Sequence, residues 1–127
     1  MKPGRMKGRF VIASGPVIIE KGNVLLVKHD DKFWKFPGGA MKHNETPEKC
    51  AVREAKEELG IKVKLIKPIK PMVLWNRDET VLLIHYLAKR TGNIKPAKFI
   101  DKWAWLDTKK LPKDVGPNIK PVLKKIL

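Results

Sequence analysis

The sequence predicts a single α+β domain over residues 1–127, and three features of the chain lead to that prediction. At 127 residues, of which 43% are hydrophobic, the chain is long enough to bury one core. Strand-like runs alternate with short turns along most of its length. Residues 46–60 carry clear start and stop signals for a helix. Internal repeats, low-complexity tracts and credible linkers, which would divide the chain further, are not found in the sequence.

Five strands are expected, each bounded by turn residues. They are residues 10–20, 24–29, 61–66, 72–75 and 80–88. In the third run the apolar residues alternate with lysines, as in a strand with one buried face. Residues 76–78 read as a hairpin turn between the last two strands. A short apolar piece at residues 103–106 follows, and residues 118–127 are expected to form a final helix with Pro121 near its start.

The first residues superficially resemble a secretion signal, because basic residues precede an apolar run. Gly15 and Pro16 interrupt that run, however, and a turn at residues 20–23 continues it as a hairpin, which favours a first strand. No stretch approaches the roughly 20 apolar residues that a membrane span needs. The single cysteine, Cys50, excludes an internal disulfide and suits a reducing compartment. We therefore expect a cytoplasmic protein.

The helix at residues 46–60 has the strongest local signals. Thr46 is a suitable N-cap, Pro47 fits the first helical position, and Gly60 supplies the stop. At about 100° per residue, one edge of this helix gathers three glutamates within an arc of roughly 100°. They are Glu54, Glu57 and Glu58. A neighbouring apolar stripe is expected to pack on the core and consists of Ala51, Val52, Ala55 and Leu59.

Three carboxylates gathered in this way repel one another, and a hard divalent cation would remove the repulsion. Oxygen-only ligands favour Mg²⁺ or Mn²⁺ over zinc. The alternative is an ordinary exposed helix face with i, i+4 ion pairs, such as Arg53 with Glu57. Taken alone, the helix leaves both interpretations open.

The formal net charge of +15 indicates an affinity for polyanions such as nucleotides or RNA. A solvated lysine-rich surface explains the same charge and is the favoured interpretation. A dedicated nucleic-acid groove is less favoured, because the basic residues are not interleaved with repeated aromatic residues.

The residues before the helix at positions 46–60 also follow a definite spacing. From Gly39 the chain reads Gly, five residues, Glu45, seven residues, then Arg-Glu-Ala-Lys-Glu-Glu-Leu-Gly-Ile at residues 53–61. This resembles the signature box of the Nudix hydrolases at every fixed position over 23 residues. Ala55 stands where that family more often has a larger aliphatic residue. The Trp-Lys-Phe-Pro-Gly-Gly lead-in at residues 34–39 is also similar to that family.

The resemblance implies a Nudix fold, which is a mixed β-sheet sandwiched between helices, with the box forming a loop-helix-loop. It also implies hydrolysis of the diphosphate linkage of a nucleoside diphosphate joined to another group, with Mg²⁺ or Mn²⁺ as cofactor. By matching positions, the metal would be bound by Gly38 (through its carbonyl), Glu54, Glu57 and Glu58. The catalytic set would be these three glutamates with Arg53. Arg53 and Glu45 would join the helix to the loop as a charged hydrogen-bonded pair.

Substrate-binding candidates are Lys28, Phe36, Gly39 and Asp101. Lys28 would meet phosphates at a strand end, and Phe36 would line the nucleotide pocket. Many family members carry a further glutamate as ligand or base where this chain has Phe99, and Asp101 is its nearest replacement. For each candidate a structural role, as strand end, cap or core residue, stays open. His85 and Cys50 are expected to be buried core residues.

The favoured substrate is a nucleoside triphosphate, cleaved to the monophosphate and pyrophosphate. Alternatives within the family are RNA 5′ ends, dinucleoside polyphosphates and ADP-ribose. An alternative from another class is a non-catalytic module that senses nucleotides or binds RNA, which intact box carboxylates disfavour. The expected partners are a nucleotide and, as an alternative, RNA, but no membrane. The sequence leaves the oligomeric state open, a homodimer included.

Overall fold

The computed structural model describes residues 8–29 and 32–127, so Lys2, Arg5 and Lys7 of the signal-like start lie outside the described residues. The elements run in the order β1 (Arg9–Glu20), β2 (Asn23–Lys28), β3 (Gly39–Ala40), α1 (Pro47–Leu59), β4 (Lys62–Pro68), β5 (Met72–Asn76), β6 (Glu79–Thr91), β7 (Lys102–Asp107) and α2 (Ile119–Lys124). The first strand is therefore confirmed. No helix within the described ranges is long and apolar enough to cross a membrane.

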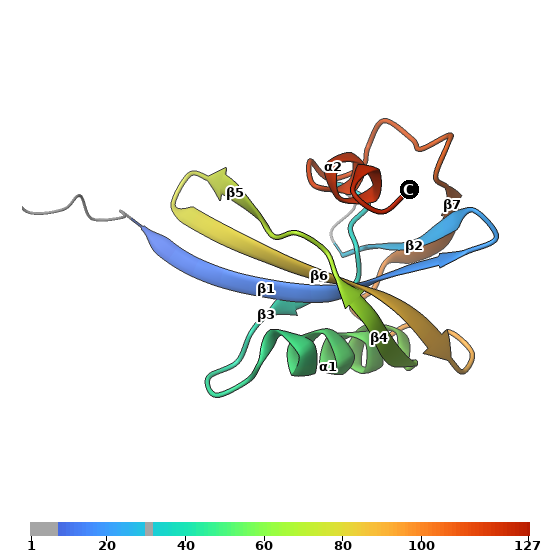
Figure 1. Cartoon of the computed structure of the whole chain (residues 1–127), viewed down its shortest axis with the longest axis horizontal. Helices are drawn as coiled ribbons and strands as arrows, with labels where there is room; N and C mark the ends of the chain where they lie inside the picture. Colours follow the sequence, from blue (N-terminus) through green and yellow to red (C-terminus); the bar gives the residue numbers. More distant parts are fainter. Residues whose placement is uncertain (1–7, 30–31) are drawn as a thin grey trace, which may run out of the picture.

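The strands form one mixed sheet, as the resemblance implies. Its order is β4-β6-β1-β2-β7, with β3 paired to β1 and β5 paired to β6. β1 and β6 run parallel, from the Arg9–Glu79 pair to the Ile18–Ala88 pair, and the other pairings are antiparallel. Figure 1 shows α1 on one side of this sheet and α2 on the other.

Two apolar clusters hold the helices to the sheet, one on each face. Val17 of β1 packs in the cluster that includes Ile119, Val122 and Leu123 of α2. The next residue, Ile18, packs in the cluster that includes Ala55 and Leu59 of α1, with Leu25 and Val27 of β2. Successive strand residues point to opposite faces, so β1 contributes to both clusters.

Helix α1 begins and ends where its sequence signals predict. The Thr46 hydroxyl accepts the Lys49 N–H at 3.2 Å, and Pro47 occupies the first turn. Gly60 ends the helix with φ 65°, a left-handed conformation that costs glycine little. Ala51 and Ala55 are fully buried against the sheet.

The expected apolar stripe of α1 needs one correction. Val52 is 40% exposed and does not belong to the buried face. The buried residues of the helix are Cys50, Ala51, Ala55, Glu58 and Leu59. Compared with the expected stripe, the buried face of α1 includes Glu58 in place of Val52. One of the three carboxylates is therefore buried.

The Thr46 cap predicts a measurable loss of stability. Thr46→Ala removes the side-chain acceptor that caps the first turn of α1, so the free energy of unfolding should fall by about 1 kcal/mol. Urea unfolding followed by circular dichroism measures this change. Thr46→Ser keeps the hydroxyl and should stay close to the parent protein; equal losses in both variants would contradict the capping role.

Other elements differ from expectation mainly in length. The final helix spans Ile119–Lys124 and is shorter than the expected residues 118–127, while β6 extends to Thr91. The two-residue strand β3 was not expected at all, because its pairing with Ala13 and Ser14 of β1 is set by tertiary structure. The hairpin turns at residues 20–23 and 76–78 lie where they were predicted.

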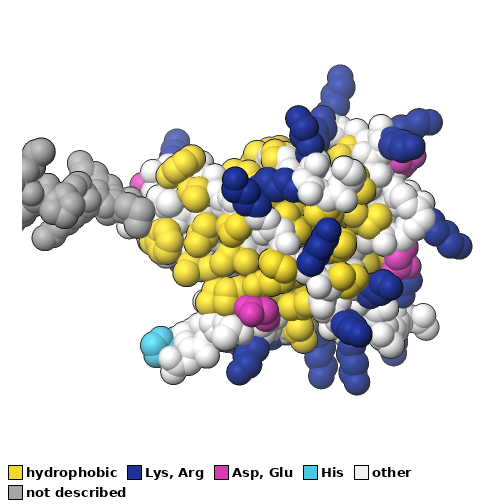
Figure 2. All heavy atoms as spheres, viewed as in Figure 1, with side chains coloured by type: hydrophobic (Ala, Val, Ile, Leu, Met, Phe, Trp, Pro, Cys, Tyr) yellow, Lys and Arg dark blue, Asp and Glu magenta, His cyan; other side chains and the backbone are white. Residues whose placement is uncertain are grey.

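The surface carries its positive charge as scattered lysines and arginines. Figure 2 shows them projecting around much of the visible face, with few acidic side chains between them. This pattern agrees with the favoured interpretation of a solvated basic surface.

Candidate functional site

The two glycines that precede α1 in the chain lie directly against its carboxylates. The Gly38 N–H donates to Oε2 of Glu58 at 2.6 Å. A Cβ on Gly39 would lie 2.6 Å from Oε1 of Glu54, so a larger residue there would require this carboxylate to move. Gly38 has φ 148°, and a Cβ there would lie 2.6 Å from the Ser14 carbonyl oxygen. The turn is thus shaped to bring backbone and carboxylates together.

Arg53 links the carboxylates of α1 to the loop before it. Its guanidinium donates to Glu45 at 2.6 Å from Nε and 2.9 Å from Nη2, and to the Ala40 carbonyl at 3.2 Å. Nη1 donates to Glu54 at 3.0 Å and to Glu57 at 2.9 Å. The Arg53–Glu45 pair implied by the family resemblance is therefore present, together with the i, i+4 pair to Glu57.

The fork of hydrogen bonds from Arg53 has an electrostatic consequence for Glu45. The bonds from Arg53 and from the Lys42 N–H lower the pKa of Glu45 to about 2. Glu45 is therefore ionised at any physiological pH and holds Arg53 in one orientation.

Glu58 is a buried carboxylate whose pKa lies far from its ordinary value. It is 1% exposed, and burial raises its pKa to about 8, with the negative charges of Glu54 and Glu57 adding to the rise. Its Oε1 makes no hydrogen bond of acceptable geometry but lies 2.7 Å from Nε2 of His29. A buried carboxylate among other carboxylates gains from a cation at its side.

The oxygen atoms around Glu58 are of the kind that bind a hard divalent cation. They are carboxylate oxygens and backbone carbonyls in a setting where burial disfavours the charged form of Glu58. Within residues 8–29 and 32–127, no three acidic, thiol or imidazole groups already converge as a metal site. Instead, Arg53 holds Glu54 and Glu57. Gly38, Glu54, Glu57 and Glu58 stay predicted ligands.

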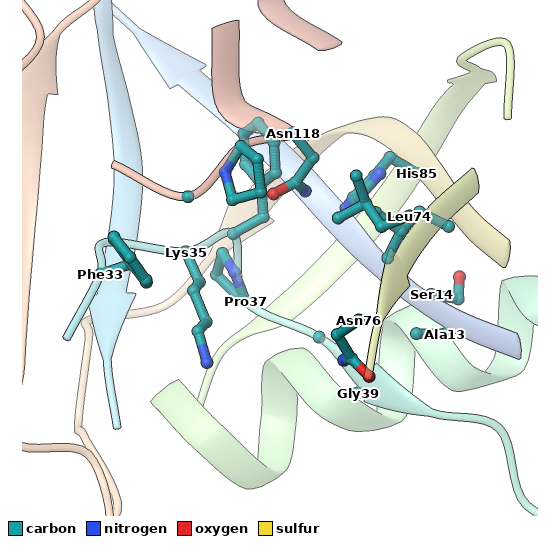
Figure 3. Close-up of a pocket in the computed structure, with 15 residues that line it drawn as sticks. Ala13, Ser14, Phe33, Lys35, Pro37, Gly39, Leu74, Asn76, His85 and Asn118 are labelled. Atoms are coloured by element: carbon teal, nitrogen blue, oxygen red, sulfur yellow. The ribbon is translucent and has the colours of Figure 1, made fainter. Parts of the chain in front are cut away.

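A cavity of about 320 Å³ adjoins this cluster, a volume suited to a small molecule. Gly38 and Gly39 form part of its wall, which connects the cavity to the carboxylates of α1. Its polar side chains come from distant parts of the chain, and Figure 3 shows them around it. They are Ser14, Lys35, Asn76, His85 and Asn118.

His85 contributes an uncharged ring to the cavity wall. Burial lowers its pKa to about 4, and the positive charge of Lys125 acts in the same direction. Its ring lies 4.9 Å from that of Phe36, which also lines the cavity and is almost fully buried. The expectation that His85 is a buried residue is confirmed, and the role of Phe36 toward a nucleotide stays a prediction.

The remaining predicted substrate residues lie in different settings. Gly39 lines the cavity. Lys28 is 8% exposed; its Nζ donates to Asp114 at 2.6 Å and lies 5.0 Å from the Trp34 ring centre. Asp101 is exposed next to β7, and its N–H donates to the Lys28 carbonyl at 2.9 Å. Lys28 thus already has an anionic partner, and the roles of Lys28 and Asp101 toward substrate stay predictions.

Sequence reasoning did not single out Lys35, Asn76 or Asn118 of the cavity wall. Asn76 ends β5, Asn118 precedes α2 and Lys35 follows β2, and only the folded sheet brings them together. Their turn and cap positions were visible in the sequence, but such positions are common at exposed sites. Cys50 is buried as expected, and burial raises its pKa to about 11, which makes the thiol unreactive.

Comparisons with known proteins agree with this geometry. A family model described as NUDIX domain matches residues 9–126. An 8-oxo-dGTP diphosphatase from Proteus vulgaris is 40% identical over 62 residues, covering 45% of this chain and 55% of the relative. An RNA pyrophosphohydrolase from Blochmanniella pennsylvanica is 33% identical over 90 residues, covering 68% of this chain and 52% of the relative. The chain thus spans about half the length of these two curated relatives.

The fold is shared with solved structures. A MutT NUDIX hydrolase from Burkholderia pseudomallei superimposes with a TM-score of 0.86 at 22% identity, covering 94% of this chain and 99% of that one. At this level of identity the likeness concerns the fold, which is the mixed sheet between helices that the sequence predicted.

Proposed function

This chain belongs to the Nudix hydrolase family, and from that premise we propose that it hydrolyses nucleotide diphosphate linkages with a divalent cation as cofactor. The substrate we propose is a nucleoside triphosphate, cleaved to the monophosphate and pyrophosphate. The family relative from Proteus vulgaris, named an 8-oxo-dGTP diphosphatase, supports this substrate class.

One observation carries the proposal: the cavity and the carboxylate cluster share the Gly38–Gly39 wall. Gly38 binds Glu58, Gly39 lies against Glu54, and both glycines line the cavity. A nucleoside held in the cavity would therefore direct its phosphates toward α1. A partly apolar pocket next to carboxylates that can hold a divalent cation suits a ligand with an organic end and a phosphate end.

The residues of the chain have distinct tasks in this reaction. Glu54, Glu57, Glu58 and the Gly38 carbonyl would hold Mg²⁺ or Mn²⁺. The cation would neutralise the diphosphate oxygens and lower the pKa of the attacking water. Arg53 fixes the direction of Glu54 and Glu57 through its two hydrogen bonds, while Glu45 fixes Arg53. The buried position of Glu58 keeps one carboxylate in place without the side-chain entropy of an exposed glutamate.

A hydrolysis screen tests the proposal. Purified protein would be incubated with Mg²⁺ and nucleoside triphosphates including 8-oxo-dGTP, ADP-ribose, dinucleoside polyphosphates or 5′-triphosphorylated RNA, with products identified by mass. We expect a nucleoside monophosphate and pyrophosphate, and no turnover when EDTA replaces the metal. The Glu57→Gln protein, purified in parallel, controls for contaminating phosphatases. Turnover of none of these substrates would contradict the enzymatic function and favour a nucleotide-binding module.

A second substrate, the 5′ end of RNA, is supported by the net charge of +15 and by the RNA pyrophosphohydrolase relative. This reading predicts that activity on triphosphorylated RNA falls steeply with salt, because displaced counterions drive RNA binding. Parallel salt titrations with RNA and with a free nucleoside triphosphate separate the two substrates. A preference for the free nucleotide at every salt concentration would exclude the RNA function.

A further inference from the structure

The cavity has a single formally charged side chain on its wall among the described residues, and this is Lys35. The other polar side chains of the wall are uncharged: Ser14, Asn76, Asn118 and the neutral imidazole of His85. An ammonium group at the wall of an otherwise uncharged cavity is a point of attraction for an anion.

The backbone of Lys35 is fixed from both sides. Its N–H donates to the Val27 carbonyl at 2.8 Å, and the Val27 N–H donates back to Lys35 at 2.9 Å. On the other side, Trp34 exchanges backbone hydrogen bonds of 2.8 Å with Asp114 and Gly116. Only the side-chain torsions of Lys35 are therefore free to vary.

The side chain of Lys35 lies on the face of the sheet that α1 covers. Lys35 pairs directly with Val27 in an antiparallel bridge, and paired residues point to the same face. Val27 packs in the cluster formed with Ala55 and Leu59 of α1. In Figure 3 the Lys35 side chain accordingly extends away from Asn118, with its ammonium group directed toward the helix.

Two carboxylates of α1 contact the cavity wall to which Lys35 belongs. Glu54 rests against Gly39 and Glu58 binds Gly38, and both glycines belong to the same cavity wall as Lys35. In the described part of the chain, none of the ion pairs takes up the Lys35 ammonium. With respect to the described residues, its charge is available at the cavity wall that the carboxylate cluster also contacts.

We propose that Lys35 binds the phosphate group that is attached directly to the nucleoside of the substrate, a role that rests on the proposed function. The uncharged part of the cavity accepts the nucleoside, and the next group along the substrate is this phosphate. The ammonium group offsets its charge before it meets Glu54, Glu57 and Glu58, which would otherwise repel it. Lys35 thereby sets the position of the substrate along the wall.

Binding of reaction products tests this role apart from catalysis. Calorimetric titrations would compare GMP with guanosine, and UMP with uridine, on the parent protein, Lys35→Met, Lys35→Arg and Lys120→Met, all in Mg²⁺ buffer. Lys120→Met removes the same charge from an exposed position of α2 outside this cavity. Lys35→Met should weaken binding of the monophosphates by about tenfold or more and leave nucleoside binding within about twofold. Lys35→Arg should keep most of the monophosphate affinity.

The outcomes separate this inference from the function on which it rests. Equal weakening of nucleosides and monophosphates by Lys35→Met would place the lysine at the base and overturn the proposal. Unchanged monophosphate binding, or the same loss in Lys120→Met, would overturn it while leaving hydrolysis by the parent protein intact. If the parent protein neither binds monophosphates nor hydrolyses any substrate in the screen, both this inference and the proposed function fail.

Discussion

The Glu57→Gln variant should lose turnover by about a thousandfold while keeping its fold. Glu57 is 48% exposed at its side chain and accepts a hydrogen bond from Arg53 at 2.9 Å. Glutamine has the same shape and retains an acceptor for Arg53, so packing is undisturbed. What is lost is the negative charge that would hold the divalent cation. Steady-state kinetics with Mg²⁺, together with thermal unfolding of both proteins, measures the two effects.

A matched control lies on the same helix. Glu48→Gln makes the same chemical change in the first turn of α1, where Glu48 accepts a hydrogen bond from the Tyr86 hydroxyl at 3.1 Å. It should keep near-full activity. Near-full activity of Glu57→Gln with Mg²⁺ would contradict its role as a metal ligand, and a large drop in its unfolding temperature would instead assign the loss to misfolding.

The Glu58→Gln variant should make the metal-free protein more stable at alkaline pH while abolishing its activity. The pKa of Glu58 is about 8 in the folded chain against 4.5 for an ordinary glutamate. The folded state therefore holds the proton more tightly. This tighter proton binding adds to the free energy of unfolding. The contribution is fully present below pH 4.5 and is lost as the pH rises through 8. Glutamine does not titrate and avoids that loss.

Thermal unfolding in EDTA between about pH 5 and pH 9 measures the effect. The unfolding temperature of the parent protein should fall across this range relative to Glu58→Gln, by about 5 °C or more at the alkaline end. Added Mg²⁺ should restore the parent protein and leave the variant unchanged. If the unfolding temperatures of the parent protein and Glu58→Gln change in parallel with pH, the buried Glu58 does not destabilise the folded protein at alkaline pH and the prediction is wrong.

Local signals account for the parts of the fold that were predicted well. Thr46, Pro47 and Gly60 define α1 through interactions within a few residues of the chain, and alternation of apolar residues defines the strands. The Arg53–Glu45 pair spans only eight residues and lies within the recognised box. The proposed metal ligands Glu54, Glu57 and Glu58 were likewise named from that box, and Gly38 directly precedes it.

Long-range pairings account for what the sequence did not reveal. Lys28 and Asp114 are 86 residues apart, and no local pattern links them. The cavity wall runs from Ala13 to Asn118, so its polar residues could not be grouped before the sheet was known. The exposure of Val52 and the burial of Glu58 follow from how α1 is rotated on the sheet, which helical periodicity leaves undetermined within about one residue.

The parallel pairing of β1 with β6 also affects how the chain folds during its synthesis. The β1 strand leaves the ribosome well before residues 79–91, which supply its main partner along ten successive residue pairs. Until then its apolar residues can pair only with β2 and β3 over short stretches. The nascent chain therefore carries β1 without its main partner until β6 has been synthesised, and completion of the sheet must await closure of a long loop. Slow folding is the expected consequence for the newly made chain.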